Sequence, residues 1–327
     1  ILTGLNISVA LFTAGIGTWI FHLVTKMKMP VFLGSSFAYI TPVVLIAKEY
    51  GGLAYATGGI AVAGLMYLVL SLLVYFLGSK VIYEFFPPIV TGPIIMVIGL
   101  NLAPTAVNMA KDNWLLAGIS LIAVIGVSLY AKGFIRVLPV ICGLIIGYIA
   151  AIAMDVVDFK PITEAAWFGL PPFMLPKFSG EAISIIAPVA VVTMVEHIGD
   201  VLAVSATVGD DFVKDPGLHR TLLGDGIATS IAAMFGGPAN TTYSENTGVL
   251  ALTRVYDPWV MRIAACFALV LAMIPKLGAL ISSIPVPVIG GISIVLFGMI
   301  AAVGVRTVVE NQVDFKLSRN LIIGAVI

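Results

Sequence analysis

Five ionisable residues lie in apolar stretches of the sequence, where a charge is costly. They are Glu196, His197, Asp200, Asp225 and Glu245. A carboxylate in a hydrocarbon interior normally faces a cavity or a partner, because burial without one is unfavourable. Glu196 and Asp200 are one helical turn apart and share a face with Thr193. This pattern predicts carboxylates that bind a ligand or carry a proton.

A structural interpretation of the same residues stays open. A polar cluster that ties helices together also accounts for Glu196, Asp200 and Glu245. His197 lies about 100° around a helix from Glu196 and fits a structural role better than a ligand role. Asp225 comes early in its stretch and fits an interfacial or helix-pairing residue. The spacing of Glu196, His197 and Asp200 does not converge on a metal ion, and HExxH is absent, so we expect neither a metal site nor an enzyme.

The composition is that of a membrane protein. Hydrophobic residues make up 60% of the 327 residues and charged residues 10%, and the mean hydropathy is +1.11. Soluble domains carry about 25% charged residues. Many stretches are long enough to cross roughly 30 Å of hydrocarbon. We therefore predict an all-α polytopic protein in the plasma or inner membrane, in contact with the lipid bilayer. The net charge of zero argues against a nucleic-acid partner.

The apolar pattern also predicts the orientation. The expected segments are 5–24, 37–48, 52–78, 88–108, 114–131, 137–154, 183–207, 221–236, 240–252, 259–280, 284–304 and one that starts near 319. One set of alternate loops holds 12 of the 17 basic residues, and the other set holds 5. The positive-inside rule places the richer set in the cytoplasm and Ile1 outside.

Two of these segments, 37–48 and 240–252, are too short to cross a bilayer as helices. Each follows small or polar residues, in "GSSFAY" and "GGPANTTYS". Short, glycine-interrupted segments at corresponding places in two halves indicate an inverted-repeat transporter with broken helices near the bilayer midplane. We expect residues 35–38 and 241–244 to pair as short antiparallel strands, because backbone groups at this depth need partners.

The breaks predict a binding site for a small planar ligand. Thr41-Pro42 and Ser244 are expected to cap two half-helices, whose first N–H groups would be donors. Glu196 and Glu245 would be the acceptors. Donors and acceptors together suit a cyclic imide or ureide, whereas two carboxylates would repel an inorganic anion. Phe37 and Tyr243 could provide stacking walls.

Several motifs resemble one family of transporters. "ENTGVLALTR" (245–254) matches the signature [QEP]-N-x-G-x4-T-[RKG] of the nucleobase–ascorbate transporter family. "GSSFAYITPV", "FFPPIVTGPIIMVIGLNLA", "VVTMVEHIGD" and "DPGLHRTLLGDGIATSIAAMFGGPANTTYSENTG" closely resemble its uracil permease branch. The resemblance extends over the whole chain.

The resemblance implies a fold of fourteen segments in two inverted repeats of seven, divided into a core and a gate domain and often dimeric. On that pattern the chain is a fragment that lacks the first and last segments. The expected divisions are core 1–78, gate 79–158, an extracellular interfacial loop 159–182, core 183–282 and gate 283–327.

The resemblance also implies a function and a set of site residues. It indicates import of a nucleobase, foremost uracil, by proton symport with alternating access. The alternatives are a xanthine or purine permease of the same family and an anion exchanger of the same fold. No cofactor is expected besides the coupling ion, H⁺, with Na⁺ as the alternative. The implied substrate-binding residues are Glu196, Glu245, Phe37, Ser244, Tyr243 and Asn246, and the implied proton-coupling residues are Asp200 and Glu196.

Two positions depart from a pattern seen in uracil permeases. Asp200 and Phe297 stand where that type has His and Tyr in some members. A carboxylate would then do the proton work in this chain.

Overall fold

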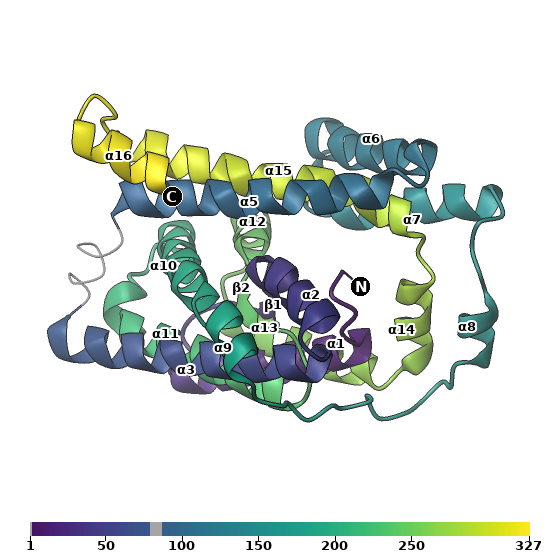
Figure 1. Ribbon diagram of the computed structural model, residues 1–327, viewed down its shortest axis with the longest axis horizontal. Helices are drawn as coiled ribbons and strands as arrows, with labels where there is room; N and C mark the ends of the chain where they lie inside the picture. Colours follow the sequence, from purple (N-terminus) through teal and green to yellow (C-terminus); the bar gives the residue numbers. More distant parts are fainter. Residues whose placement is uncertain (1, 79–86) are drawn as a thin grey trace. The chain divides into compact units, whose positions relative to one another are not determined.

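The computed structural model describes residues 2–78 and 87–327, except for the side chains of residues 244 and 245. Helices dominate the described chain, and two short strands interrupt them (Figure 1). The elements in order are α1 (Ile7–Val24), β1 (Leu33–Ser35), η1 (Phe37–Tyr39), α2 (Ile40–Glu49), α3 (Leu53–Leu77), α5 (Pro88–Ala110), α6 (Trp114–Tyr130), η2 (Gly133–Val137), α7 (Pro139–Ala153), α8 (Lys160–Glu164), α9 (Gly180–Ile186), α10 (Val189–Val208), η3 (Val213–Gly217), α11 (Leu218–Met234), β2 (Asn240–Thr242), α12 (Ser244–Thr253), α13 (Pro258–Ala272), α14 (Pro275–Ser282), α15 (Val286–Glu310) and α16 (Ser318–Val326).

The helices include several that are suited to cross a membrane. Within the described residues, five spans are long and apolar enough, or six if the bent pair α13 and α14 counts as one. Two further apolar helices, α6 and α7, are somewhat shorter. These spans confirm the prediction of a helical, multi-pass membrane protein.

The contacts divide the chain into two compact units. Unit 1 comprises Ile1–Phe85 and Ala165–Ala279, and unit 2 comprises Phe86–Glu164 and Leu280–Ile327. Each unit is therefore built from two separate parts of the sequence. The assignment of core and gate roles to these units stays a prediction.

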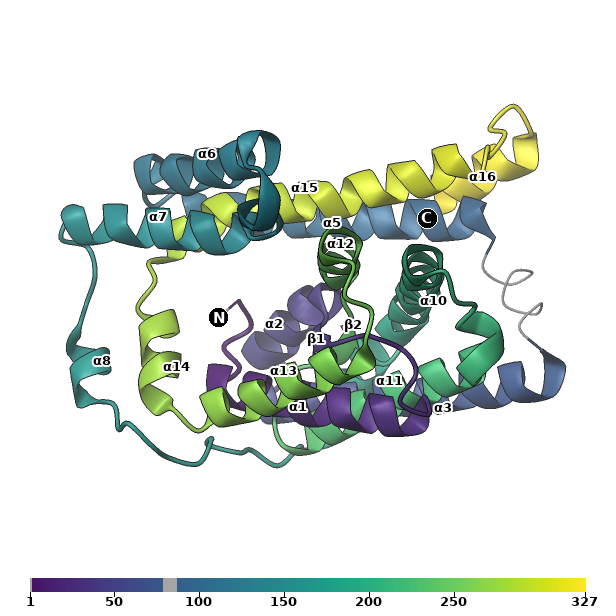
Figure 2. The same ribbon diagram turned by 180° about the vertical axis from the view of Figure 1, so that it is seen from behind.

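In unit 1, glycines let helices α3 and α11 pack closely. A Cβ atom on Gly64 of α3 would lie 2.6 Å from the carbonyl oxygen of Gly226, and one on Gly226 would lie 2.8 Å from that of Gly64. Small residues of this kind allow membrane helices to approach backbone to backbone. Helix α1 packs against α11 and α13, as Figure 2 shows from behind.

In unit 2, helices α5 and α15 run side by side (Figure 1). A Cβ atom on Gly304 would lie 2.6 Å from the carbonyl oxygen of Gly92, so these helices also touch through their backbones. A hydrophobic cluster joins α6, α7 and α15. Its buried members are Leu116, Val124, Ala151, Val288 and Ile292.

The two strands form an antiparallel pair in unit 1, as predicted, although it begins one or two residues earlier in each segment. Leu33 pairs with Thr242, and Ser35 with Asn240. The outer edges of this two-stranded sheet are also satisfied. The amide of Leu33 donates to Thr18 Oγ1 of α1 at 2.9 Å, and Thr229 Oγ1 of α11 donates to the Asn240 carbonyl at 2.8 Å. Helix side chains therefore supply the partners that lipid cannot.

The predicted helix caps are wrong by one or two residues. Helix α2 starts at Ile40 after Tyr39, and α12 starts at Ser244 after Tyr243. Neither capping residue makes a side-chain cap hydrogen bond. The turn η1 runs directly into α2, so Thr41 is already helical. A helix tolerates Pro42 in its first turn, where an N–H group has no intrahelical partner.

Three predicted segments also differ from the observed helices. The segment 259–280 is two helices, since α13 ends at Ala272 and α14 begins at Pro275. Pro188 separates α9 from α10 within 183–207. Helix α15 continues beyond residue 304 to Glu310, whose carboxylate lies 3.7 Å from Arg306 one turn earlier.

Candidate substrate site

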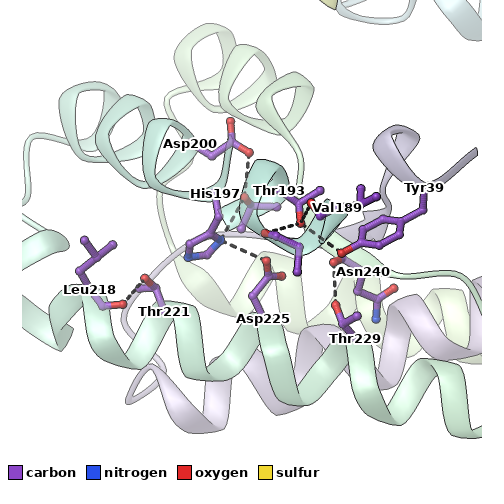
Figure 3. Close-up of polar contacts among 12 residues, drawn as sticks. Tyr39, Val189, Thr193, His197, Asp200, Leu218, Thr221, Asp225, Thr229 and Asn240 are labelled. Atoms are coloured by element: carbon purple, nitrogen blue, oxygen red, sulfur yellow. Dashed lines mark hydrogen bonds and ion pairs between the residues drawn. The ribbon is translucent and has the colours of Figure 1, made fainter. Parts of the chain in front are cut away.

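Helix α10 contacts both chain breaks of unit 1 through polar side chains. Near its start, Thr193 Oγ1 lies 3.3 Å from the Tyr39 hydroxyl of the first break. Two turns later, Asp200 Oδ2 accepts a hydrogen bond of 2.7 Å from Thr242 Oγ1 of the second break. Thr193 and Asp200 lie on the same side of the helix (Figure 3). This helix therefore holds the two breaks in fixed positions beside the face that carries Glu196.

A second buried contact links α10 to α11. His197 Nδ1 lies 3.3 Å from Asp225 Oδ2, and both side chains are fully buried (Figure 3). The contact has the distance of an ion pair but not the geometry of a hydrogen bond. Thr242 Oγ1 lies 3.4 Å from the same nitrogen. Because Thr242 gives its proton to Asp200, its hydroxyl oxygen can only accept from the His197 ring.

Asp225 is thus a helix-pairing residue, one of the two roles that the sequence allowed. The partner of Asp225 was not predicted. A signal was present, because Thr221, Asp225 and Thr229 recur every four residues and form a polar stripe on α11. Thr229 supports strand β2, and Asp225 faces His197.

Two aromatic rings from the two breaks face each other. The rings of Phe37 and Tyr243 are parallel to within 5°, and their centroids are 6.5 Å apart. The Tyr243 hydroxyl donates to the Ser35 carbonyl at 2.7 Å, which fixes the orientation of its ring. A flat ring inserted between two others needs about 3.5 Å on each side. The centroid separation is an upper limit on the distance between the two ring planes, so the gap is somewhat narrower than the roughly 7 Å that an inserted ring requires.

The remaining predicted residues lie on α10 and at the start of α12. Glu196 is half-buried on α10, one turn before Asp200. Ser244 and Glu245 begin α12, but their side chains lie outside the described residues. Asn246 Nδ2 donates to the Phe32 carbonyl at 3.0 Å and so ties α12 to the segment before β1. All the predicted site residues belong to unit 1.

Comparison with known proteins identifies the family. Residues 3–327 match a family model described as "Permease family". The chain is 45% identical over 341 residues to the uracil permease of Bacillus caldolyticus, covering 100% of this chain and 79% of the relative. The chain belongs to the nucleobase–ascorbate transporter family. The uracil permease of Escherichia coli (strain K12) is 39% identical over 338 residues, covering 100% of this chain and 78% of the relative.

A solved structure of another transporter has a similar fold. The transmembrane domain of a cyanobacterium bicarbonate transporter, BicA, matches with a TM-score of 0.66 at 17% identity, over 94% of this chain and 92% of that domain. Identity at this level shows a shared fold alone. The nucleobase–ascorbate transporter described here is thus a permease, a multi-pass protein of the cell inner membrane with a transporter fold.

Proposed function

We propose that this permease imports a nucleobase, with uracil as its substrate, by proton symport with alternating access. The observation that carries the substrate is the similarity over the whole chain to relatives named uracil permease, at 39 to 45% identity. The site chemistry agrees with it, because uracil is flat and offers both C=O and N–H groups on its edge.

In this proposal, uracil lies against the two breaks of unit 1. Phe37 and Tyr243 would stack on its faces once the gap between their parallel rings, whose centroids are 6.5 Å apart, widens slightly. The first N–H groups of α12, near Ser244, would donate to its carbonyl oxygens. Glu196 and Glu245 would accept from its ring N–H groups. Asn246 would bind substrate or, through its bond to Phe32, hold α12 in place.

Proton coupling would use Asp200 together with Glu196. The two carboxyl groups are one turn apart on α10, and Asp200 is 5% exposed. Two carboxyl groups one turn apart in a poorly hydrated place would not both ionise easily, so one of them would hold a proton. If substrate needs one protonation state of Glu196, proton and substrate binding are linked. Unit 1 would be the core that moves against unit 2 as gate, and two copies would form a homodimer.

Uptake into proteoliposomes tests the proposal. Purified full-length permease should accumulate radiolabelled uracil when the external medium is acidic, and an ionophore that dissipates the pH gradient should abolish accumulation. Accumulation driven by a Na⁺ gradient at equal pH would show that Na⁺, and not H⁺, is the coupling ion. Absence of uracil uptake with uptake of xanthine would assign the protein to the purine alternative.

Competition separates the proposed site from other readings. Cytosine has an amino donor where uracil has a carbonyl, which would leave a backbone donor unpaired at a cost of about 1–3 kcal/mol. Cytosine should therefore compete at least about fivefold more weakly than uracil. Inhibition by bicarbonate or sulfate would instead favour an anion exchanger. The likeness to BicA supports the fold and does not favour that function.

A further inference from the structure

A hollow of about 390 Å³ lies between helices α3 and α11, away from the candidate substrate site. Ser71 Oγ donates to the His219 carbonyl at 2.6 Å and joins the two helices there. The outer wall is formed by Leu72 and Tyr75, which are 57% and 63% exposed. The hollow is therefore open at the surface of unit 1. Its other lining residues are Leu68, His219, Arg220 and Leu223.

The hollow is polar at one end and apolar at the other. In α11, His219 and Arg220 lie in the first turn, and Leu223 lies about one turn further into the helix. In α3, Tyr75 lies two residues before the end of the helix, and Leu68 lies about two turns before Tyr75. The adjoining loops belong to the set rich in Lys and Arg, which the positive-inside rule places in the cytoplasm. Leu68 and Leu223 thus lie deeper in the bilayer than His219 and Arg220. Both helices give the same order.

The polar end carries the cationic guanidinium of Arg220. Arg220 Nη1 donates to the Val24 carbonyl at 3.2 Å, and this is the one hydrogen bond of its guanidinium to the described residues. A guanidinium has five N–H donors, so others can reach a ligand. The centroids of the His219 and Tyr75 rings are 5.3 Å apart. Lys26 is close enough to interact electrostatically with the His219 ring. The nearby acid Asp215 is already paired with Lys28.

We propose that this hollow binds an anionic phospholipid of the cytoplasmic leaflet. The lipid phosphate lies against Arg220 and His219, and an acyl chain follows Leu72, Leu68 and Leu223 into the bilayer. Basic pockets between membrane helices on the cytoplasmic side suit such headgroups, and this leaflet carries anionic lipids at high local concentration. A soluble anion would use the basic end alone and would leave the apolar wall uncovered.

Native mass spectrometry of the purified full-length permease tests the site. Phosphatidylglycerol should bind about tenfold or more tightly than phosphatidylcholine with the same acyl chains. Arg220→Gln should reduce phosphatidylglycerol affinity about tenfold, the loss expected for one charged hydrogen bond. Leu72→Trp adds bulk to the apolar wall at a position that is 57% exposed, and it should weaken binding to a similar extent. Lys132→Gln, a basic residue of unit 2 in the same set of loops, is the matched control and should bind as the parent does.

Three outcomes would overturn the proposal. Equal affinity for the two lipids would show that the site does not recognise the negative charge of the headgroup. Unchanged phosphatidylglycerol binding in Leu72→Trp, whatever Arg220→Gln does, would place the lipid elsewhere. Full displacement of the lipid by millimolar inorganic phosphate would show that the basic end binds a free anion.

Discussion

At the scale of single residues, neighbouring threonines of β2 do different work. Thr242 donates to Asp200 and lies beside His197, whereas the hydroxyl of buried Thr241 has no hydrogen-bond partner among the described residues. Strand residues alternate in direction, which explains why consecutive threonines meet different surroundings. The two side chains therefore form a natural matched pair for mutation.

Thr242→Val should destabilise the protein by about 1.5–3 kcal/mol, because it removes a hydrogen bond to a buried carboxyl group. Thr241→Val should be nearly neutral or stabilising, since it removes a hydroxyl that is buried without a partner. Thermal unfolding in detergent measures both. Equal effects of the two substitutions would show that the Thr242–Asp200 contact contributes no specific stability.

Asp200→Asn should separate binding from coupling. The amide keeps the shape of the side chain and fixes a neutral form, so the variant should bind uracil and exchange it across proteoliposomes. It should fail to concentrate uracil when a pH difference is imposed. If this variant concentrates uracil as strongly as the parent does, Asp200 is a structural residue and another group carries the proton.

The ion pair between Lys28 and Asp215 gives a pH-dependent contribution to stability. The hydrogen bond from Lys28 holds the pKa of the exposed Asp215 carboxyl below its usual 3.8. A carboxyl with a lowered folded-state pKa stabilises the fold above its unfolded pKa, and the effect is lost as the pH falls through the folded value. The melting temperature of Lys28→Gln should therefore be lower than that of the parent at pH 7, by a small amount. The difference should shrink as the pH falls below 3.8. A difference that stays constant down to pH 2.5 would contradict this account.

At the scale of elements, Gly34 lets the two breaks approach each other. A Cβ atom on Gly34 of β1 would clash with the ring of Tyr243. Gly34→Ala should displace this ring from its parallel position opposite Phe37 and weaken uracil binding at least tenfold. Gly118→Ala is the control, because a Cβ there meets open space on α6. Isothermal titration calorimetry measures the affinities. Parent-like affinity in Gly34→Ala would show that the ring arrangement does not matter for binding.

Most elements could be predicted because lipid imposes simple rules on them. Apolar length sets the spans, and glycine-rich interruptions set the two breaks. Both strands could be predicted to within two residues because the unwound backbone had to find partners at this depth. The break between α13 and α14 was not predicted, although Pro275 is a signal for it.

The site was harder to predict than the spans, since its contacts are tertiary. The polar stripe of α11 indicates that Asp225 faces a polar neighbour, but the local sequence does not identify that neighbour as His197, nor Tyr39 as the partner of Thr193. The predicted caps at Thr41 and Ser244 were wrong for a related reason. Capping propensity describes an isolated helix end, whereas here the preceding turn and the paired strands determine where each helix starts.

At the scale of the whole molecule, the uneven loop charges predict which surface faces the cytoplasm. In a background with Cys142 and Cys266 replaced by Ser, Lys132→Cys should react with an impermeant maleimide in inside-out vesicles. Lys177→Cys should react in intact right-side-out cells or spheroplasts. The reverse pattern would invert the topology and would place the α3–α11 hollow at the outer leaflet.

The pairing of β1 with β2 has a consequence for the synthesis of the protein. Ser35 and Tyr243 touch although they are 208 positions apart in the chain. When the ribosome has inserted the first break, the partner strand has not yet been made. Until β2 is inserted, the edge of β1 that faces it has no partner, whereas Thr18 of α1 is already available to accept from the amide of Leu33 on the other edge. Substrate binding can then serve as a sign that insertion has been completed, since nascent chains that stop before residue 240 lack the second half of the site.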